Sequence, residues 1–275
     1  MEKPILKIEE VYYAYGNGTP ALNGINMNIY EGERIAVLGS NGSGKSTFFL
    51  NINGVFTPDK GRVIYRGTVI NKKNLKELRK NIGIIFQDAD NQIIASSVGA
   101  EVGFGPMNLK LPKSEVIKRV NEAMEYMNIS DLKERPPHYL SGGEKKRVTI
   151  AGIIAMKPEI IIFDEPTASL DPFNVQMLEE VLEKLAFEKK TLIISTHDID
   201  FAYRWADRVI IFSNGEIVAD GKPLQIFKDK TTLRQANLKQ PTLIEIYELF
   251  VQKHILKSTK DYPKTIQEFK DILEY

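Results

Sequence analysis

The chain contains no cysteine among its 275 residues. A disulfide framework, a thiolate metal site and a thiol redox centre are therefore excluded, and a reducing compartment is indicated. The sequence also lacks the 18 or more consecutive apolar residues of a membrane-spanning helix, since the nearest candidate, Val148 to Met156, is far too short. The start, Met-Glu-Lys-Pro-Ile, lacks the basic-then-apolar plan of a signal peptide. We expect a chain that is soluble by itself, which does not exclude docking onto a membrane partner.

An excess of charge of either sign is also missing. The chain has 37 Lys and Arg residues against 36 Asp and Glu residues, which gives a net charge of +1. Nucleic-acid-binding surfaces normally show a basic excess, so the composition does not support a nucleic-acid partner. Only three histidines are present, scattered along the chain, and they form no metal-chelating cluster. The length and the 43% hydrophobic content permit one large domain, with or without an appendage.

What the sequence does contain is a phosphate-binding loop with the pattern G-x-x-x-x-G-K-[ST]. Its glycines let successive backbone N–H groups turn onto phosphate oxygens, Lys45 reaches the terminal phosphates, and the Ser46 hydroxyl ligates Mg²⁺. The apolar segment 34–38 runs into the loop as a strand and Lys45 to Asn53 follows as a helix, which is the context this motif requires. The predicted nucleotide-binding residues are Gly39, Ser40, Asn41, Gly42, Ser43, Gly44, Lys45, Ser46 and Thr47.

A second candidate site element is the apolar strand 160–164, which ends in Asp164 and Glu165. Side chains alternate along a strand, so adjacent acids at its carboxyl end point in different directions and can take different roles. We expect Asp164 to hold Mg²⁺ through a water, and Glu165 to polarise the attacking water as general base. The alternative is a pair of solvated acids in a turn, which the buried strand and the phosphate loop disfavour.

Two further strand ends carry polar side chains. His197 follows the strand 191–195, where parallel sheets place ligand groups, and we predict that it contacts the γ-phosphate and the attacking water. Gln87 follows the strand 82–86, and its amide is a candidate to ligate Mg²⁺ and orient water. Gln92 is a competitor that spacing alone does not separate from Gln87. His138 and His254 have no comparable context and are interpreted as structural.

The segment Leu140-Ser-Gly-Gly-Glu144 predicts the start of a helix that runs to Met156. Ser141 and Glu144 form a Ser-x-x-Glu capping box, with Ser141 as N-cap. A helix start bared by glycines also presents free N–H groups and a positive dipole end, both of which suit a phosphate. Because this segment lies far along the chain from Lys45, it is a candidate to serve the nucleotide of another molecule.

Three tyrosines, Tyr12, Tyr13 and Tyr15, precede the turn at 16–18. An aromatic ring there can stack on a purine, and Tyr15 is chosen because it lies nearest the turn. At least one of the three is expected to be an ordinary half-buried strand residue.

The remaining pattern predicts an α/β fold. Short strands and turns fill the first 38 residues, a small hairpin is expected at 62–70, and apolar strands alternate with helices after 160. A helical block at about 88–156 interrupts this doubly wound core. Residues 223–275 predict two or three amphipathic helical segments, broken at Pro241 and near Pro263.

Together these motifs resemble the ATP-binding subunit of ABC transporters over roughly residues 5–222. The family's motifs occur in order: aromatic loop (Tyr15), Walker A (39–47), Q-loop (Gln87), signature (140–144), Walker B (160–165), D-loop (Ser169-Leu170-Asp171) and H-loop (His197). The resemblance implies a P-loop NTPase fold of the ABC-ATPase type, with a RecA-like parallel-sheet core, an antiparallel β subdomain and an inserted α-helical subdomain. It further implies an ATP- and Mg²⁺-dependent ATPase.

The resemblance also implies a head-to-tail dimer of two such subunits, identical or related. Each ATP would lie between the Walker A loop of one subunit and the signature of the other, so that Ser141, Gly142, Gly143 and Asp171 act across the interface. Closure and hydrolysis would drive membrane-embedded partners, which places the chain at the cytoplasmic face of the cell membrane. The expected domains are 1–222 for ATP binding and 223–275 for a C-terminal helical extension.

A finer resemblance rests on Phe86-Gln-Asp-Ala-Asp-Asn-Gln-Ile93 and the following stretch from Glu101 to Pro106. These segments are similar to the ATPases of energy-coupling factor (ECF) importers, above all to the cobalt-type subunit CbiO. In that family the region after the Q-loop receives the coupling helices of a transmembrane subunit, and here Gln92, Ile93 and Phe104 would line the groove. The C-terminal extension fits a dimerising tail. The pair Asp88-Ala89 departs from the common Asn-Pro.

The expected function is therefore ATP hydrolysis coupled to uptake of cobalt or a related metal or vitamin through a coupling subunit and a substrate-binding subunit. A rival class, non-transport ABC ATPases of chromosomes or ribosomes, needs long coiled-coil insertions or two such domains in one chain. A regulator that binds nucleotide without turnover is opposed by the presence of both Glu165 and His197. The residues leave the transported substrate open.

Overall fold

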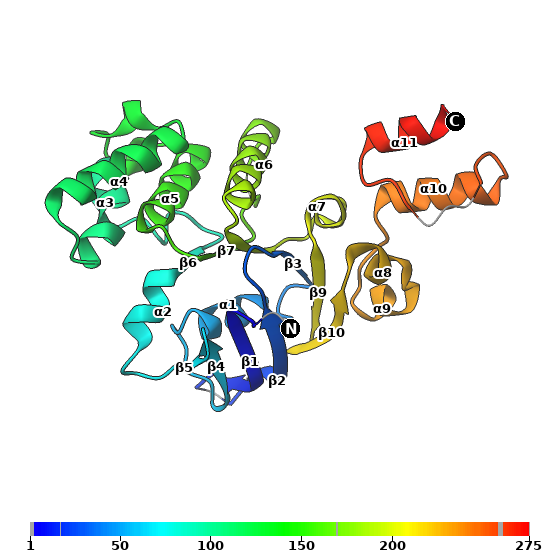
Figure 1. The fold of residues 1–275 in the computed structure, drawn as a ribbon, viewed down its shortest axis with the longest axis horizontal. Helices are drawn as coiled ribbons and strands as arrows, with labels where there is room; N and C mark the ends of the chain where they lie inside the picture. The colour runs from blue at the N-terminus through cyan, green and yellow to red at the C-terminus, as the bar shows by residue number, and fades with distance from the viewer. Residues whose placement is uncertain (1–2, 17, 169, 258–260, 275) are drawn as a thin grey trace.

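In the computed structural model, which describes residues 3–16, 18–168, 170–257 and 261–274, the chain is built around a central six-stranded sheet (Figure 1). The strand order is β10-β9-β3-β8-β7-β6, and all neighbours are parallel except the edge pair β9 and β10. The strands are β3 (Arg34–Leu38), β6 (Ile82–Ile85), β7 (Ile160–Asp164), β8 (Thr191–Ser195), β9 (Arg208–Ser213) and β10 (Glu216–Gly221). The predicted parallel core is confirmed.

A second sheet is antiparallel and four-stranded, in the order β2-β1-β4-β5. Its strands are β1 (Leu6–Ala14), β2 (Pro20–Ile29), β4 (Lys60–Tyr65) and β5 (Thr68–Val69), and they lie below the central sheet in Figure 1. The short α1 (Lys45–Ile52) follows β3 and is buried between the two sheets through Phe48 and Phe49. This is the expected antiparallel subdomain.

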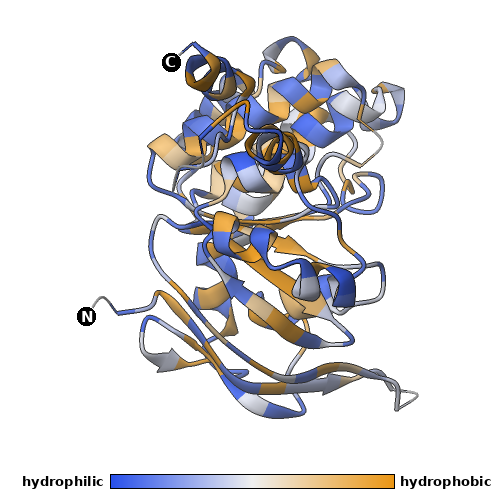
Figure 2. Ribbon diagram, turned by 90° about the vertical axis from the view of Figure 1, so that its right-hand side faces the viewer, coloured by the Kyte–Doolittle hydropathy of each residue, from blue (hydrophilic) through white to orange (hydrophobic). Residues whose placement is uncertain are grey.

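Alternation along the central strands divides the apolar core between the two faces of the sheet. In β3, Ile35 and Val37 belong to the cluster shared with the antiparallel sheet, whereas Ala36 and Leu38 belong to the cluster under the helices. Figure 2 shows the resulting concentration of apolar residues along the central strands. Strands buried on both faces read as continuous apolar runs, which is why the sequence revealed them so clearly.

The helical block is formed by α3 (Val98–Asn108), α4 (Lys113–Tyr126) and α5 (Gly142–Met156), which contact one another in the upper part of Figure 1. The predicted capping box is present at the start of α5. The Ser141 hydroxyl oxygen accepts a hydrogen bond from the Glu144 N–H at 3.3 Å, and a Glu144 carboxylate oxygen accepts one from the Ser141 N–H at 2.7 Å. The bond from the Ser141 N–H, together with one from the Ser141 hydroxyl to the same carboxylate oxygen, lowers the pKa of Glu144.

The other helices of the core are α2 (Leu75–Asn81), α6 (Pro172–Phe187) and α7 (Ile199–Trp205). The sequence analysis did not predict α2, a helix of 7 residues that buries only Leu78. Such a short segment carries too few turns to show a helical period.

The C-terminal extension contains four helices in the described residues, so the prediction of two or three segments was wrong. They are α8 (Pro223–Lys228), α9 (Lys230–Gln235), α10 (Thr242–Gln252) and α11 (Ile266–Leu273). Asp229 ends α8 and caps α9 through the N–H groups of Thr231 and Thr232, so two short helices replace one. Phe227 and Leu233 are buried in the same apolar cluster as the helical face of the central sheet, which fastens the first part of the extension to the core.

Within the described part of the chain, none of the helices combines the length and the apolar character needed to cross a bilayer.

Candidate nucleotide-binding site

The predicted site residues meet at the carboxyl edge of the central sheet. Strands β3, β8, β7 and β6 are neighbours and parallel, so the loops that follow them lie at the same edge. A pocket of about 320 Å³ opens there. Residues 41–47 form one wall, and Tyr15, Gln87 and Glu165 are also in contact with it.

The loop between β3 and α1 has the backbone geometry of a phosphate cradle. Gly39 and Gly44 have φ angles of 144° and 108°, which side chains rarely tolerate. A Cβ atom on Gly39 would lie 2.4 Å from the Phe212 carbonyl oxygen, and one on Gly44 would lie 2.7 Å from the Ala21 carbonyl oxygen. The buried Ser43 hydroxyl has no hydrogen-bond partner in the described residues, so a phosphate oxygen would satisfy it.

Lys45 and Glu165 lie in the pocket, and His197 contacts Glu165 beside it. The Lys45 ammonium is buried, donates to the Gly39 carbonyl oxygen at 2.8 Å, and lies 3.7 Å from Oε1 of Glu165. Burial lowers the pKa of Lys45, while Glu165 and Asp164 act in the opposite direction. His197 Nε2 lies 2.9 Å from the same Glu165 oxygen and 3.0 Å from Oδ1 of Asn41.

The Ser195 hydroxyl joins the ends of β7 and β8 through two hydrogen bonds. It donates to Oδ1 of Asp164 at 2.6 Å and accepts from the Glu165 N–H at 2.8 Å. Asp164 is buried, and Glu165 has a φ of 47°, a left-handed conformation that is uncommon for a residue other than glycine. Strain of this kind is typical of functional sites, and here it turns the Glu165 side chain toward Lys45 and His197.

Three oxygen donors are available for Mg²⁺. The Ser46 and Gln87 side chains line or border the pocket, and Asp164 keeps Oδ2 without a hydrogen bond among the described residues. Hydroxyl, amide and carboxylate oxygens are the donors that Mg²⁺ prefers, and the remaining positions of its octahedron go to phosphate oxygens and water. The donor set therefore fits the ion.

The two candidate glutamines are now separated. Gln87 is exposed and contacts the nucleotide pocket. The Gln92 amide instead bonds the backbone of β6, accepting from the Phe86 N–H at 3.1 Å and donating to the Ile84 carbonyl oxygen at 3.3 Å. Gln92 thus shapes the turn, and the Gln87 amide is left for a ligand.

The tyrosines also divide as expected. Tyr15 is 42% exposed, lines the pocket, and its hydroxyl lies 2.7 Å from Oγ1 of Thr47. Tyr13 is half-buried and stacks on Phe56 with ring centroids 4.9 Å apart. Tyr15 is therefore the tyrosine whose ring is available to a base.

The signature and D-loop residues lie away from this pocket. None of Ser141, Gly142, Gly143 and Asp171 lines it, although all four belong to the described residues. Asp171 caps α6 by accepting from the Asn174 N–H at 2.8 Å, and its pKa is lowered by this bond. Ser169 lies outside the described residues. One chain thus supplies only one wall of the predicted nucleotide site.

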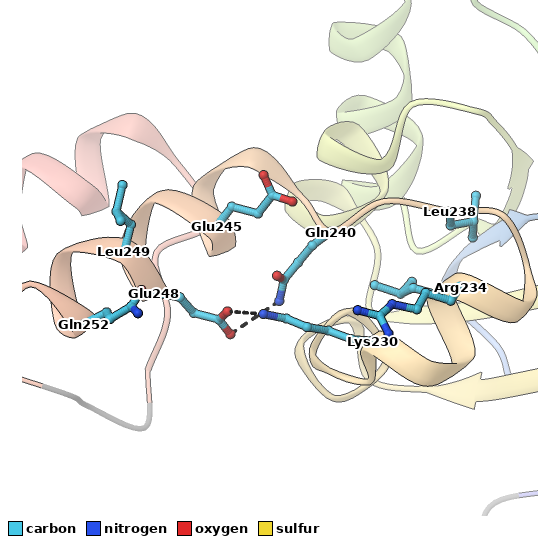
Figure 3. A pocket seen from close by; sticks show the side chains of 9 residues that line it. Lys230, Arg234, Leu238, Gln240, Glu245, Glu248, Leu249 and Gln252 are labelled. Carbon is cyan, nitrogen blue, oxygen red and sulfur yellow. Dashed lines mark hydrogen bonds and ion pairs between the residues drawn. The ribbon is translucent and has the colours of Figure 1, made fainter.

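A larger pocket, of about 420 Å³, lies in the C-terminal extension between α9 and α10 (Figure 3). The Lys230 ammonium meets Glu248 there at 2.9 Å, and Gln240 donates to the other oxygen of the same carboxylate at 3.4 Å. These groups satisfy one another, and no predicted nucleotide-binding residue lines the pocket. The larger pocket is therefore not the predicted nucleotide-binding site.

A family model described as "ABC transporter" matches residues 22–168. Among curated proteins, the energy-coupling factor transporter ATP-binding protein EcfA of Methanocaldococcus jannaschii is 45% identical over 251 residues, which are 90% of each chain. The chain belongs to the ABC transporter ATP-binding family, in its energy-coupling factor branch. A Methanosarcina mazei ABC transporter ATP-binding protein is longer: at 43% identity the match covers 98% of this chain and 60% of that one.

Solved structures agree with this assignment. The CbiO1 protein of Clostridium perfringens, described as part of the ABC transporter complex CbiONQ, is 45% identical with a TM-score of 0.75, over 90% of this chain and 99% of that one. An ATP-binding cassette solved as a dimer in a post-hydrolysis state with ADP and phosphate is 31% identical with a TM-score of 0.71, over 79% and 98%. The predicted ABC-ATPase fold is confirmed, and the chain is an ATPase of the class that uses ATP with Mg²⁺.

Three contacts were missed by the sequence analysis. Ser195, the last residue of the strand before His197, was given no role, and its place opposite Asp164 on β7 and β8 is what gives it one. The Asn41 side chain was treated only as part of the phosphate loop. Lys146, a buried residue of α5, was not considered at all.

Proposed function

We propose that this chain is the ATP-hydrolysing subunit of an ECF-type importer, working as a head-to-tail dimer at the cytoplasmic face of the membrane. The observation that carries the proposal is the composition of the pocket: one chain lines it with residues 41–47, Gln87 and Glu165, and His197 contacts Glu165, while the chain's own signature segment does not line it. A partner's signature would complete the site, as expected for a family that includes a cassette solved as a dimer with ADP and phosphate.

Within each site, the backbone of 39–47 and the Lys45 ammonium would hold the phosphates. Ser46 and Gln87 would hold Mg²⁺ with Asp164 in the outer shell, and the ion would neutralise phosphate charge. Glu165 would accept a proton from the attacking water, and His197 would donate to the γ-phosphate. The Lys45 ammonium and His197 Nε2 both lie against Glu165, and a γ-phosphate that attracts these two groups would free the carboxylate for water.

A strip of exposed apolar side chains supports docking to a membrane partner. Ile94, Phe104 and Met107 are 67%, 45% and 55% exposed, and we call them the α3 strip. Glu101 fixes the loop before α3 to the helix by accepting from the N–H groups of Ile94 and Ala95 at 2.9 and 2.8 Å. Because Phe104 and Met107 follow Glu101 at helical spacing and Glu101 also holds the loop at Ile94, the three apolar side chains lie on one face of the helical block.

The transported substrate is proposed only as a class, cobalt or a related metal or vitamin. In the described residues no group of three or more His, Cys, Asp or Glu side chains could hold a metal ion. Any metal selectivity would therefore reside in the membrane partners, and this chain would supply the energy. The names of the relatives do not favour the chromosome- or ribosome-associated class.

The proposal predicts that affinity-tagged chain, expressed in its native host and purified from detergent-solubilised membranes, carries integral membrane subunits. Phe104→Glu should reduce their yield about tenfold or more, because it places a charge in an apolar contact. The free Phe104→Glu chain should keep its ATPase rate within about twofold, because Phe104 does not line the nucleotide pocket. Quantitative mass spectrometry of the purified complexes checks the yield.

Phe187→Glu is the matched control, since Phe187 is an exposed aromatic residue on α6, outside the α3 strip. It should leave the yield of membrane subunits unchanged. Equal loss with both variants would remove the α3 strip from the proposal. Recovery of RNA or DNA in place of membrane subunits would contradict the transport function and favour the rival class.

A further inference from the structure

Lys146 is a buried cation that the proposed chemistry does not use. It lies one turn into α5, directly after the signature segment, and only 4% of it is exposed. Burial lowers its pKa to about 8, with Asp164 and Asp88 acting in the opposite direction. Lysine is almost never fully buried unless its ammonium is paired, so its partners need an explanation.

Those partners are backbone carbonyls of the Q-loop. The Lys146 ammonium donates to the Phe86 carbonyl oxygen at 2.9 Å and to the Gln87 carbonyl oxygen at 2.8 Å. These carbonyls belong to consecutive residues that leave β6 and enter the nucleotide pocket. A charged donor forms stronger hydrogen bonds to carbonyls than a neutral one, and more so when water is excluded.

The position of Gln87 depends on this backbone. Its side chain is exposed to the pocket and makes no hydrogen bond in the described residues, so side-chain contacts do not hold it. The preceding residue, Phe86, is held at both of its backbone polar groups: its N–H donates to Gln92 and its carbonyl oxygen accepts from Lys146. Lys146 therefore links the backbone at Gln87 to α5, the helix that begins with the signature segment.

We propose that Lys146 is a positioning residue for ATP hydrolysis, which fixes Gln87 in the pocket by holding the Phe86 and Gln87 carbonyls on the signature helix. The inference rests on the proposed function, in which Gln87 ligates Mg²⁺. A movement of α5 would then carry the Q-loop with it. The signature helix, which would contact the partner's nucleotide, is thereby coupled to Gln87, which would contact the nucleotide of its own chain.

Lys145, the preceding residue, provides a comparison. Its ammonium lies 2.6 Å from Asp90, which is 69% exposed, so it also links α5 to the Q-loop region but at the surface. Exposed ion pairs contribute little, because water competes with them. Lys145→Met is therefore a matched control that removes a neighbouring lysine of the same helix without touching the carbonyls of Phe86 and Gln87.

The test is a double-mutant cycle on kcat between Lys146→Met and Gln87→Ala. Lys146→Met alone should lower kcat about 10- to 100-fold, the loss expected for a displaced catalytic group, and leave nucleotide affinity without Mg²⁺ within about twofold. In a Gln87→Ala chain the same substitution should lower kcat by less than about twofold, because its effect passes through Gln87. Lys145→Met should stay within about twofold of the wild type.

Lys146→Gln separates hydrogen bonding from charge. Its amide is one atom shorter, is neutral, and can donate two hydrogen bonds to the two carbonyls, so it should restore kcat to within about fivefold of the wild type. This variant also keeps the test valid if Lys146→Met does not fold. A Lys146→Gln chain that folds but is as slow as Gln87→Ala would overturn the proposal.

Additive effects of Lys146→Met and Gln87→Ala would likewise overturn the inference and leave only a structural role for Lys146. If the wild-type chain and Lys145→Met hydrolyse ATP normally, that result leaves the proposed function intact. Absence of Mg²⁺-dependent hydrolysis by the wild-type chain would contradict the proposed function, and the inference with it.

Discussion

Glu165→Gln is expected to lower the rate of ATP hydrolysis about 100- to 1,000-fold, the range typical for loss of a general base. The amide is nearly isosteric with the carboxylate but cannot accept the proton of the attacking water. The surroundings of the side chain should survive, because the Glu165 N–H bond to Ser195 and the left-handed φ of 47° belong to the backbone. Phosphate release measured at saturating Mg²⁺ and ATP checks this rate.

The same variant should still bind ATP and should remain dimeric for as long as ATP is bound. Replacing Glu165 removes a negative charge that lies 3.7 Å from the Lys45 ammonium, so Lys45 keeps its attraction for phosphate. Glu125→Gln, an exposed position on α4, is the control and should hydrolyse ATP normally. Normal turnover by Glu165→Gln would refute its assignment as the base.

Lys45→Met should weaken ATP binding about 100-fold, which corresponds to about 3 kcal/mol. Methionine has a similar volume and is one atom shorter, but it removes a buried ammonium that now donates to the Gly39 and Ser40 carbonyl oxygens at 2.8 and 3.3 Å. A charged hydrogen bond contributes about 1.5 to 3 kcal/mol, and the ammonium would make more than one to the phosphates.

Equilibrium binding of a fluorescent ATP analogue measures the affinity, and thermal unfolding shows whether the chain is intact. Lys118→Met is the control, because Lys118 is 65% exposed on α4 and pairs only with Glu122 at 3.8 Å. Undiminished affinity in a folded Lys45→Met chain would mean that Lys45 does not meet the phosphates.

The sequence predicted the parts of the fold that follow simple periodicity. The apolar run 160–164 and the strand 34–38 are buried on both faces of the central sheet, so no polar residue interrupts them. The start of α5 was predicted to the residue because the Ser141 and Glu144 side chains encode it directly. The division of α8 from α9 was missed because it depends on Asp229 serving two helix ends at once.

The site divides in the same way. Site residues that belong to a local motif, such as Lys45 and Glu165, could be predicted from the sequence, and both line the pocket. The choice between Gln87 and Gln92 required the structure, because both follow the same strand and only hydrogen bonds to β6 distinguish them. Lys146 lies about sixty residues from the carbonyls that it binds, and no local pattern shows such a contact.

Crosslinking between two introduced cysteines tests the shared nucleotide site most directly. The chain has no native cysteine, so only the introduced thiols can react. Ser40→Cys is placed in one Glu165→Gln chain and Gly142→Cys in another, since Ser40 is exposed beside Lys45 and a Cβ on Gly142 meets no atom within 4 Å. With Mg²⁺ and ATP, a short thiol-reactive crosslinker should join one chain of each kind, and neither variant alone should crosslink to itself. No crosslink in the mixture while ATP is bound, or equal crosslinking without nucleotide, would contradict the head-to-tail dimer.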